Sequence, residues 1–239
     1  MTPPLTPDGF KAATGVSRET LDRLTAYARL LEKWTRRINL VSRASLADLW
    51  RRHLLDSAQL MNHLPPPPPD RPRVVIDLGS GAGLPGLVLA ILGAGEIHLV
   101  ESDQRKAAFL REAGRAAGCV SPMGRDSVTV HNCRIEDLTP FPVDLVTARA
   151  LAPLPKLIGL AEGFLLSRFQ PSPPPGHPIH DSAEQTDHPL ALFLKGRGAA
   201  AELAAAREKW PLEAESLVSD TDPSAIVLRL RLLDPVGNP

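Results

Sequence analysis

The chain has 239 residues, of which 43% are apolar and 23% charged, with 27 basic and 27 acidic side chains. This neutral total does not indicate a protein that binds nucleic acid over its whole surface, and two cysteines exclude a disulfide framework. No apolar run is long enough to span a bilayer and the first residues, MTPPLTPDGFK, lack an apolar signal segment, so we expect a cytoplasmic protein without membrane contact.

Residues 1–64 are predicted to form an N-terminal helical cap. Apolar residues recur every three or four positions over 17–41, where Ser17 is placed to cap the helix. A second helix is expected to begin near Ser45, with Asp48 completing a capping-box-like pair, and to continue toward Leu64. The first 60 residues carry ten basic and six acidic side chains, so the basic surplus of the chain lies here.

Five consecutive prolines, residues 65–69, mark the clearest boundary in the chain. They are compatible with neither a helix nor a central strand, so 65–72 is expected to be a stiff linker before a domain over 73–239. In that domain short apolar strands alternate with helices, which is typical of a parallel α/β sheet covered on both faces. The expected strands are 74–78, 97–100, 127–131, 144–148 and one from 192; the expected helices are 85–92, 104–117 and 154–166. A C-terminal β-hairpin is expected from 215–218 and 225–232.

Residues 170–189 interrupt this alternation. They contain six prolines and few apolar residues, and we expect a flexible surface insertion. The histidines His177, His180 and His188 have no cysteine or acidic residue spaced to complete a metal site, so no metal is expected.

A glycine-rich loop, VVIDLGSGAGLPG, follows the strand at 74–78. Gly81, Gly83 and Gly86 satisfy the G-x-G-x-x-G pattern of dinucleotide-binding proteins, so an NAD-type oxidoreductase is one alternative. Asp77 disfavours it, because a carboxylate repels a pyrophosphate and attracts an ammonium group. The pattern Asp77-x-Gly79-x-Gly81-x-Gly83 therefore favours a ligand with an amine near the loop.

A second acid, Glu101, ends the next strand 22 residues after Gly79, where a carboxylate can accept from ribose hydroxyls. An amine and a ribose without phosphate favour S-adenosylmethionine. At the same edge of the sheet Ile135 is placed to pack on the adenine, with Glu136 near its amine, and Arg149 ends a further strand.

Several motifs resemble one family. They are LLEKWTRRINLVS (30–42), RRHLLDSAQL (51–60), VIDLGSGAGLPGLVLA (75–90), RIEDL (134–138), ARALAPL (148–154) and LKGR (194–197). In these the chain is similar to the bacterial small-subunit ribosomal RNA guanine-N7 methyltransferases, the glucose-inhibited division protein B family. The resemblance implies a class I, Rossmann-like methyltransferase fold, S-adenosylmethionine as donor and a guanosine of 16S rRNA as acceptor. It also implies cofactor contacts at Gly79, Leu84, Ile135, Glu136 and Arg149.

Guanine N7 has a free lone pair and no proton, so its methylation needs no general base. We expect alignment of substrate and cofactor to supply catalysis. The candidate residues near the base are Arg52, His53, Arg149 and Lys195, although a buried His53 bonded to Asp56 or to backbone is an equally good interpretation. For RNA contact we expect Arg36, Arg37, Arg51, Arg52, Lys195 and Arg197.

Three other functions stay open at this point. The chain could methylate a small molecule or a protein, it could be the dinucleotide oxidoreductase, or it could be a non-catalytic RNA-binding or ribosome-assembly factor. Nothing in the sequence requires a dimer, and a monomer is expected.

Overall fold

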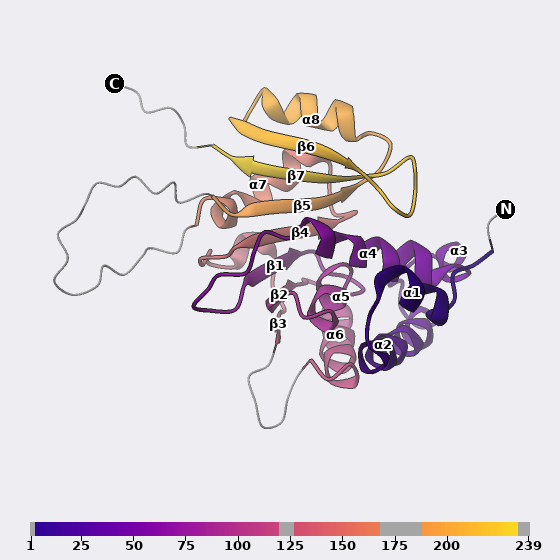
Figure 1. The fold of residues 1–239 in the computed structure, drawn as a ribbon. Helices are drawn as coiled ribbons and strands as arrows, with labels where there is room; N and C mark the ends of the chain where they lie inside the picture. Colours follow the sequence, from indigo (N-terminus) through magenta and orange to yellow (C-terminus); the bar gives the residue numbers. More distant parts are fainter. Residues whose placement is uncertain (1–2, 120–126, 168–187, 234–239) are drawn as a thin grey trace, which may run out of the picture.

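The computed structural model describes residues 3–119, 127–167 and 188–233. Its centre is a seven-stranded sheet in the order β3-β2-β1-β4-β5-β7-β6 (Figure 1). The first five strands run parallel, and β7 pairs antiparallel with both β5 and β6. The strands are β1 (Val74–Leu78), β2 (Glu96–Val100), β3 (Val128–His131), β4 (Leu145–Arg149), β5 (Leu190–Lys195), β6 (Leu212–Val218) and β7 (Ile226–Leu232).

Helices cover both faces of this sheet because alternate strand residues point to opposite sides. The helices α5 (Gly86–Ile91) and α6 (Gln104–Ala116) pack on the face that includes Val75 and Leu99. The opposite face, with Ile76 and Val146, is covered by α7 (Leu154–Leu165) and α8 (Ala199–Arg207). The predicted parallel α/β architecture with a C-terminal hairpin is therefore confirmed, and α8 is an addition to the expected elements.

The N-terminal segment is more broken than expected. It consists of α1 (Pro7–Thr14), α2 (Arg18–Thr35), α3 (Arg43–Leu46), the π-helix η1 (Trp50–Leu55), α4 (Asp56–Ala58) and the 3₁₀-helix η2 (Gln59–His63). Ser17 caps α2 as predicted, its hydroxyl accepting from the Thr20 amide. The predicted extension of α2 to residue 41 is wrong, because the chain turns after Arg36 so that Leu40 and Val41 pack against the core.

The predicted capping pair of Ser45 and Asp48 is also wrong. The cap of α3 is Ser42, which accepts from the Ser45 amide, while the Asp48 carboxylate accepts from the Leu5 amide at 2.8 Å. The Asp48–Leu5 bond joins residues 43 positions apart, which local spacing does not reveal, whereas the Ser42 cap is a local feature that the prediction missed.

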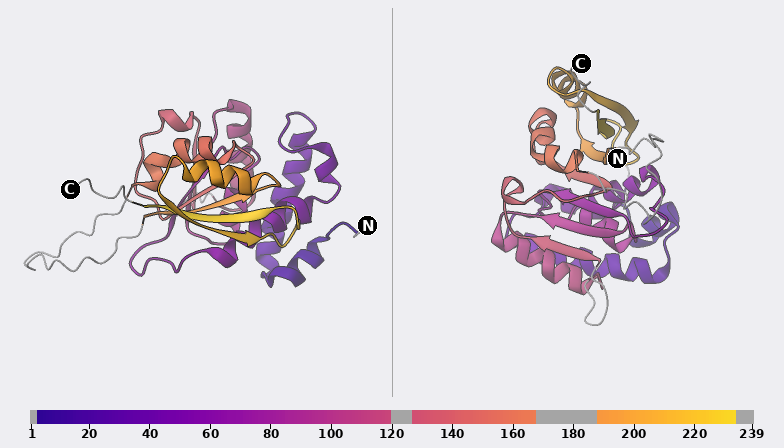
Figure 2. Two further views of the ribbon diagram at one scale, coloured as in Figure 1. Left: turned by 90° about the horizontal axis from the view of Figure 1, so that it is seen from above. Right: turned by 90° about the vertical axis from the view of Figure 1, so that its left-hand side faces the viewer.

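The N-terminal helices and the sheet share one hydrophobic core. Phe10, Leu24 and Leu31 belong to the same cluster of buried residues as Val75 and Phe109. In both Figure 1 and Figure 2 the helices lie beside α5 and α6 at one end of the molecule. The prolines 65–69 form no helix or strand, and the proposed boundary at 65–72 stays a prediction. The insertion predicted at 170–189 lies outside the described residues up to residue 187.

Candidate functional site

The glycine loop connects the C-terminal end of β1 to α5, at the edge of the sheet where the parallel strands end. A Cβ on Gly79, whose φ is +65°, would lie 2.5 Å from Leu151 Cδ1. Gly81 has φ +54°, and a Cβ there would have its nearest neighbours at 3.7 and 4.0 Å. At Gly79 a side chain would clash with Leu151, which packs against the backbone there. At Gly81 the backbone is open beside a cavity.

That cavity has a volume of about 360 Å³ and is the first of two that the site contains. Five predicted cofactor residues line it together: Gly79, Gly81, Glu101, Ile135 and Glu136. Val100, Leu151 and Leu160 provide apolar walls, and Lys106, Arg134 and Lys156 add basic groups. The cavity thus combines apolar walls with charged side chains, and its volume falls in the range of small-molecule sites. Lys106 and Lys156 were missed from the sequence, because they lie on helices rather than at strand ends.

Glu101 connects the loop to the second strand. Its Oε2 accepts from the Gly81 amide at 2.9 Å and its Oε1 accepts from the Asp103 amide at 2.8 Å. Only 7% of the residue is exposed. Each carboxylate oxygen can accept a further hydrogen bond, so Glu101 both fixes the loop and offers an acceptor to a ligand.

Asp77 lies behind the loop and does not line the described cavity. It is fully buried, and its carboxylate accepts from the Thr147 hydroxyl at 2.8 Å and from the Gly86 amide at 3.3 Å. Burial raises the pKa of this carboxyl to about 6. Gly83 and Leu84 are buried in the same way and line neither cavity. Direct contact of Asp77, Gly83 and Leu84 with a ligand stays a prediction, which their buried positions do not support. These residues lie behind the loop and stabilise its conformation.

Tyr27, the single tyrosine of the chain, is a site residue that the sequence analysis missed. From α2 its hydroxyl donates to the carbonyl of Ala82 at 2.7 Å, inside the glycine loop. Burial raises the pKa of this hydroxyl, so it stays protonated and remains a donor. In the sequence, the one sign of this role was a tyrosine within the otherwise apolar stripe that contains Leu24 and Leu31.

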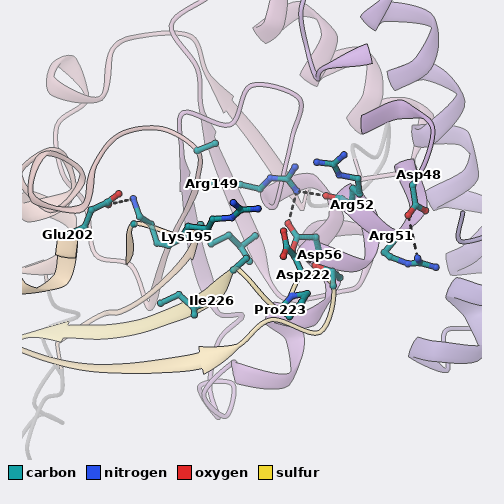
Figure 3. A pocket seen from close by; sticks show the side chains of 17 residues that line it. Asp48, Arg51, Arg52, Asp56, Arg149, Lys195, Glu202, Asp222, Pro223 and Ile226 are labelled. Carbon is teal, nitrogen blue, oxygen red and sulfur yellow. Dashed lines mark hydrogen bonds and ion pairs between the residues drawn. The ribbon is translucent and has the colours of Figure 1, made fainter. Parts of the chain in front are cut away.

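Figure 3 shows a second cavity, which has a volume of about 580 Å³. Ala150, whose φ is +51°, lines both. A positive φ is uncommon for alanine and is found more often at functional sites. Five predicted residues line the second cavity: Arg51, Arg52, Arg149, Lys195 and Arg197.

Arg149 is held at the end of β4 by residues of the N-terminal segment. Its Nη1 donates to the Asp56 carboxylate at 3.0 Å and to the Arg52 carbonyl, and its Nη2 donates to His53 Nδ1. Arg149 was expected beside the cofactor, but of the two cavities it lines only the second. Cofactor contact by Arg149 therefore stays a prediction.

His53 is buried and lines neither cavity. Its Nε2 lies 2.8 Å from the Ser45 hydroxyl, which donates to the Ser42 carbonyl. Because Nδ1 accepts from Arg149, Nε2 must carry the proton. Burial and the Arg149 charge lower the pKa of His53 to about 3, so the ring is neutral. The geometry supports the interpretation of a buried histidine, with Arg149 and Ser45 as partners in place of Asp56.

The other basic candidates differ in whether they are already paired and in where they are exposed. Lys195 Nζ pairs with Glu202 at 2.6 Å and donates to the Ala152 carbonyl at 3.0 Å. Arg52 and Arg197 are exposed at the cavity, whereas Arg36 and Arg37 are exposed at the end of α2 and line neither cavity.

Two further features concern the described residues alone. They contain no group of three or more histidine, cysteine or acidic side chains placed to hold a metal ion; His177 and His180 lie outside them. None of their helices has the length and apolar character that crossing a membrane requires.

Comparison with known proteins identifies the family. The family model of GidB, described as rRNA small subunit methyltransferase G, matches residues 20–169. The chain belongs to this family. A ribosomal RNA small subunit methyltransferase G of Rhodospirillum centenum is 50% identical and matches 95% of this chain and 91% of the relative. That of Rhodospirillum rubrum is 46% identical over 95% of this chain and 97% of the relative.

Solved structures confirm the class I methyltransferase fold of this family member. Cofactor-bound Rv0187 from MTB superposes with a TM-score of 0.56 at 17% identity, covering 97% of this chain and 98% of that one. A TehB-like SAM-dependent methyltransferase from Corynebacterium glutamicum gives a TM-score of 0.51 at 16% identity over 86% and 99% of the two chains. The family and fold predicted from the sequence are therefore confirmed.

Proposed function

We propose that this chain transfers the methyl group of S-adenosylmethionine to N7 of one guanosine in the 16S rRNA of the small ribosomal subunit. The observation that carries the proposal is the pair of cavities that meet at Ala150, one beside the glycine loop and one lined by arginines. Membership of the rRNA small subunit methyltransferase G family supports the reaction and the substrate class. Because the small ribosomal subunit is the substrate, we expect the protein to act in the cytoplasm. We expect the reaction to need no metal, and a monomer to suffice because a single chain contains both cavities.

The residues of the first cavity fit S-adenosylmethionine. Gly81 leaves the main chain open, Glu101 offers an acceptor for ribose hydroxyls, and Ile135 and Glu136 line the same cavity. The cofactor supplies an electrophilic methyl group on its sulfonium.

The second cavity suits a guanine with its N7 directed toward Ala150. Since N7 has no proton to lose, no general base is needed, and two groups near Arg149 that could act as one are already engaged. His53 has a bond at each ring nitrogen, and Asp56 accepts from Arg149. The residues here orient the base and exclude water, which is how positioning lowers a barrier.

The arginines of the second cavity suit the RNA backbone and guanine O6. Arg52 and Arg197 are exposed at its rim, and arginine is a frequent partner of phosphate oxygens and of O6. Lys195 is paired with Glu202, so its role is to fix the segment at Ala152. Arg51 also lines this cavity, but its guanidinium is less available to RNA because it bonds Pro3 and Asp48.

The test uses labelled S-adenosylmethionine and small subunits from a strain that lacks this methylation, with the modified nucleoside mapped by mass spectrometry. We expect one 7-methylguanosine in 16S rRNA, and loss of transfer in Glu101→Ala. Label at another position, or transfer only to proteins or small molecules, contradicts the proposal. Titration with NADH serves as a control, and tight NADH binding without S-adenosylmethionine binding would favour an oxidoreductase.

A further inference from the structure

The second cavity is lined by four acidic residues, of which three form an ion pair with a basic residue. Asp48 accepts from the Leu5 amide and pairs with Arg51. Asp56 accepts from Arg149, Thr221 and Gln59. Glu202 pairs with Lys195 and accepts from the Leu154 amide.

Asp222 is the fourth, in the tight turn between β6 and β7. Its Oδ1 accepts from the Ser224 amide at 2.8 Å and from the Ser224 hydroxyl at 2.7 Å. Its Oδ2 has no hydrogen bond or ion pair with any residue that the structure describes, and the side chain is exposed at the cavity. The bonds from Ser224 lower the pKa of this carboxyl, so it is ionised at neutral pH.

The turn that carries Asp222 is fixed to Asp56, which also holds Arg149, and to Gln59. The Thr221 hydroxyl donates to Asp56 Oδ1 at 2.7 Å, and the Asp220 amide donates to Gln59 Oε1 at 2.8 Å. Asp56 also accepts from Arg149, so one carboxylate connects the turn to the end of β4. Figure 3 shows Asp222, Asp56 and Arg149 from three different elements at one cavity.

The chemistry of guanine explains what an unoccupied carboxylate oxygen offers here. When N7 faces Ala150 and the cofactor, the opposite edge of the base, with its N1–H and N2–H₂ donors, points into the second cavity. Arginine and lysine cannot accept these bonds. A carboxylate can, and adenine does not present the same two adjacent donors.

We infer that Asp222 determines specificity for guanine by accepting hydrogen bonds from N1–H and N2–H₂. This inference rests on the proposed function. It separates two roles in the second cavity, in which arginines bind phosphate and O6 while one carboxylate reads the edge that distinguishes guanine.

The test compares guanosine with inosine at the target position of site-specifically ligated 16S rRNA. Inosine keeps N7, O6 and N1–H and lacks only the N2 amino group. We expect wild-type kcat/KM to fall roughly 10- to 100-fold with inosine, the range of one good base contact. In Asp222→Asn, Oδ1 still accepts from Ser224 while a donor replaces Oδ2. Its kcat/KM on guanosine should fall by a similar factor, with discrimination against inosine reduced to about 1- to 3-fold.

Asp220→Asn is the matched control, because it removes the same charge from the same turn at a residue that does not line the cavity. We expect it to keep the wild-type ratio, and all three proteins to bind S-adenosylmethionine equally by calorimetry. Equal discrimination in wild type and Asp222→Asn, or wild type that does not discriminate, would overturn the inference and leave the proposed function intact. Wild type that methylates neither RNA would overturn the proposed function and the inference with it.

Discussion

At the scale of single residues, Tyr27 shows how the N-terminal segment reaches the cofactor site. Its hydroxyl is the donor to the Ala82 carbonyl in the glycine loop. Tyr27→Phe removes that donor and leaves a carbonyl without its partner, which costs about 1–2 kcal/mol. We expect a Kd for S-adenosylmethionine that is raised roughly 5- to 30-fold in calorimetry, the factor equivalent to that cost. Thr35→Val is the control, since it removes a buried hydroxyl of α2 that bonds Leu31 and not the loop. Equal Kd values for wild type and Tyr27→Phe would contradict a positioning role.

His53 gives a prediction on pH at the same scale. Its pKa is lowered from 6.5 to about 3 in the folded protein, chiefly by burial. Between those values the unfolded chain binds a proton that the folded chain does not, so the free energy of unfolding decreases as the pH falls. The slope is at most about 1.4 kcal/mol per pH unit. We expect His53→Gln to flatten urea-unfolding stability between pH 4.5 and 6.5 relative to wild type. His63→Gln, outside the Arg149 network, should leave the wild-type slope unchanged.

At the scale of elements, the crossing of α5 over β1 and β2 depends on Gly86. A Cβ there would lie 2.4 Å from Leu99 Cδ2 and 2.7 Å from Asp77 Cβ. Gly86→Ala should therefore lower the free energy of unfolding by about 1–3 kcal/mol, the cost of overpacking a core. Gly159→Ala in α7 is the control, because its Cβ would find its nearest neighbour, Trp210, at 3.7 Å. Urea unfolding checks both, and a Gly86→Ala variant as stable as wild type would show that α5 can shift.

Elements also show where sequence patterns were sufficient. The strands β1, β2 and β4 were placed within one residue of their observed bounds, because short apolar runs between turn residues are a local signal. The N-terminal helices were not, because this segment is held by bonds that spacing does not reveal, such as those of Ser45 with His53 and of Asp48 with Leu5. The missed α8 is rich in alanine and has a weak apolar stripe, and only Ala199 and Ala206 are buried.

At the scale of the whole molecule, the neutral total charge hides a basic N-terminal segment. Arg36 and Arg37 are exposed at the end of α2, outside both cavities. We expect the reversal of both to Glu to weaken rRNA binding at low salt and to reduce its salt dependence, without changing the Kd for S-adenosylmethionine. Reversal of Arg207 and Lys209, exposed at the C-terminal end of α8, provides a control with the same change of charge. Equal RNA affinity in both variants would show that α2 does not contact RNA.

The sequence by itself determined the parallel sheet, the glycine loop, Glu101 and the family, because each follows from residues close together in the chain. Parallel strands bring their carboxyl ends to one edge, so the first cavity could be predicted from strand ends alone. Only the tertiary structure decided that Asp77 braces the loop, that Tyr27 bonds Ala82, and that Asp56 joins Arg149 to Thr221. The Asp56–Thr221 bond connects residues 165 positions apart, and such a pairing is fixed by the packing of whole elements rather than by any local pattern.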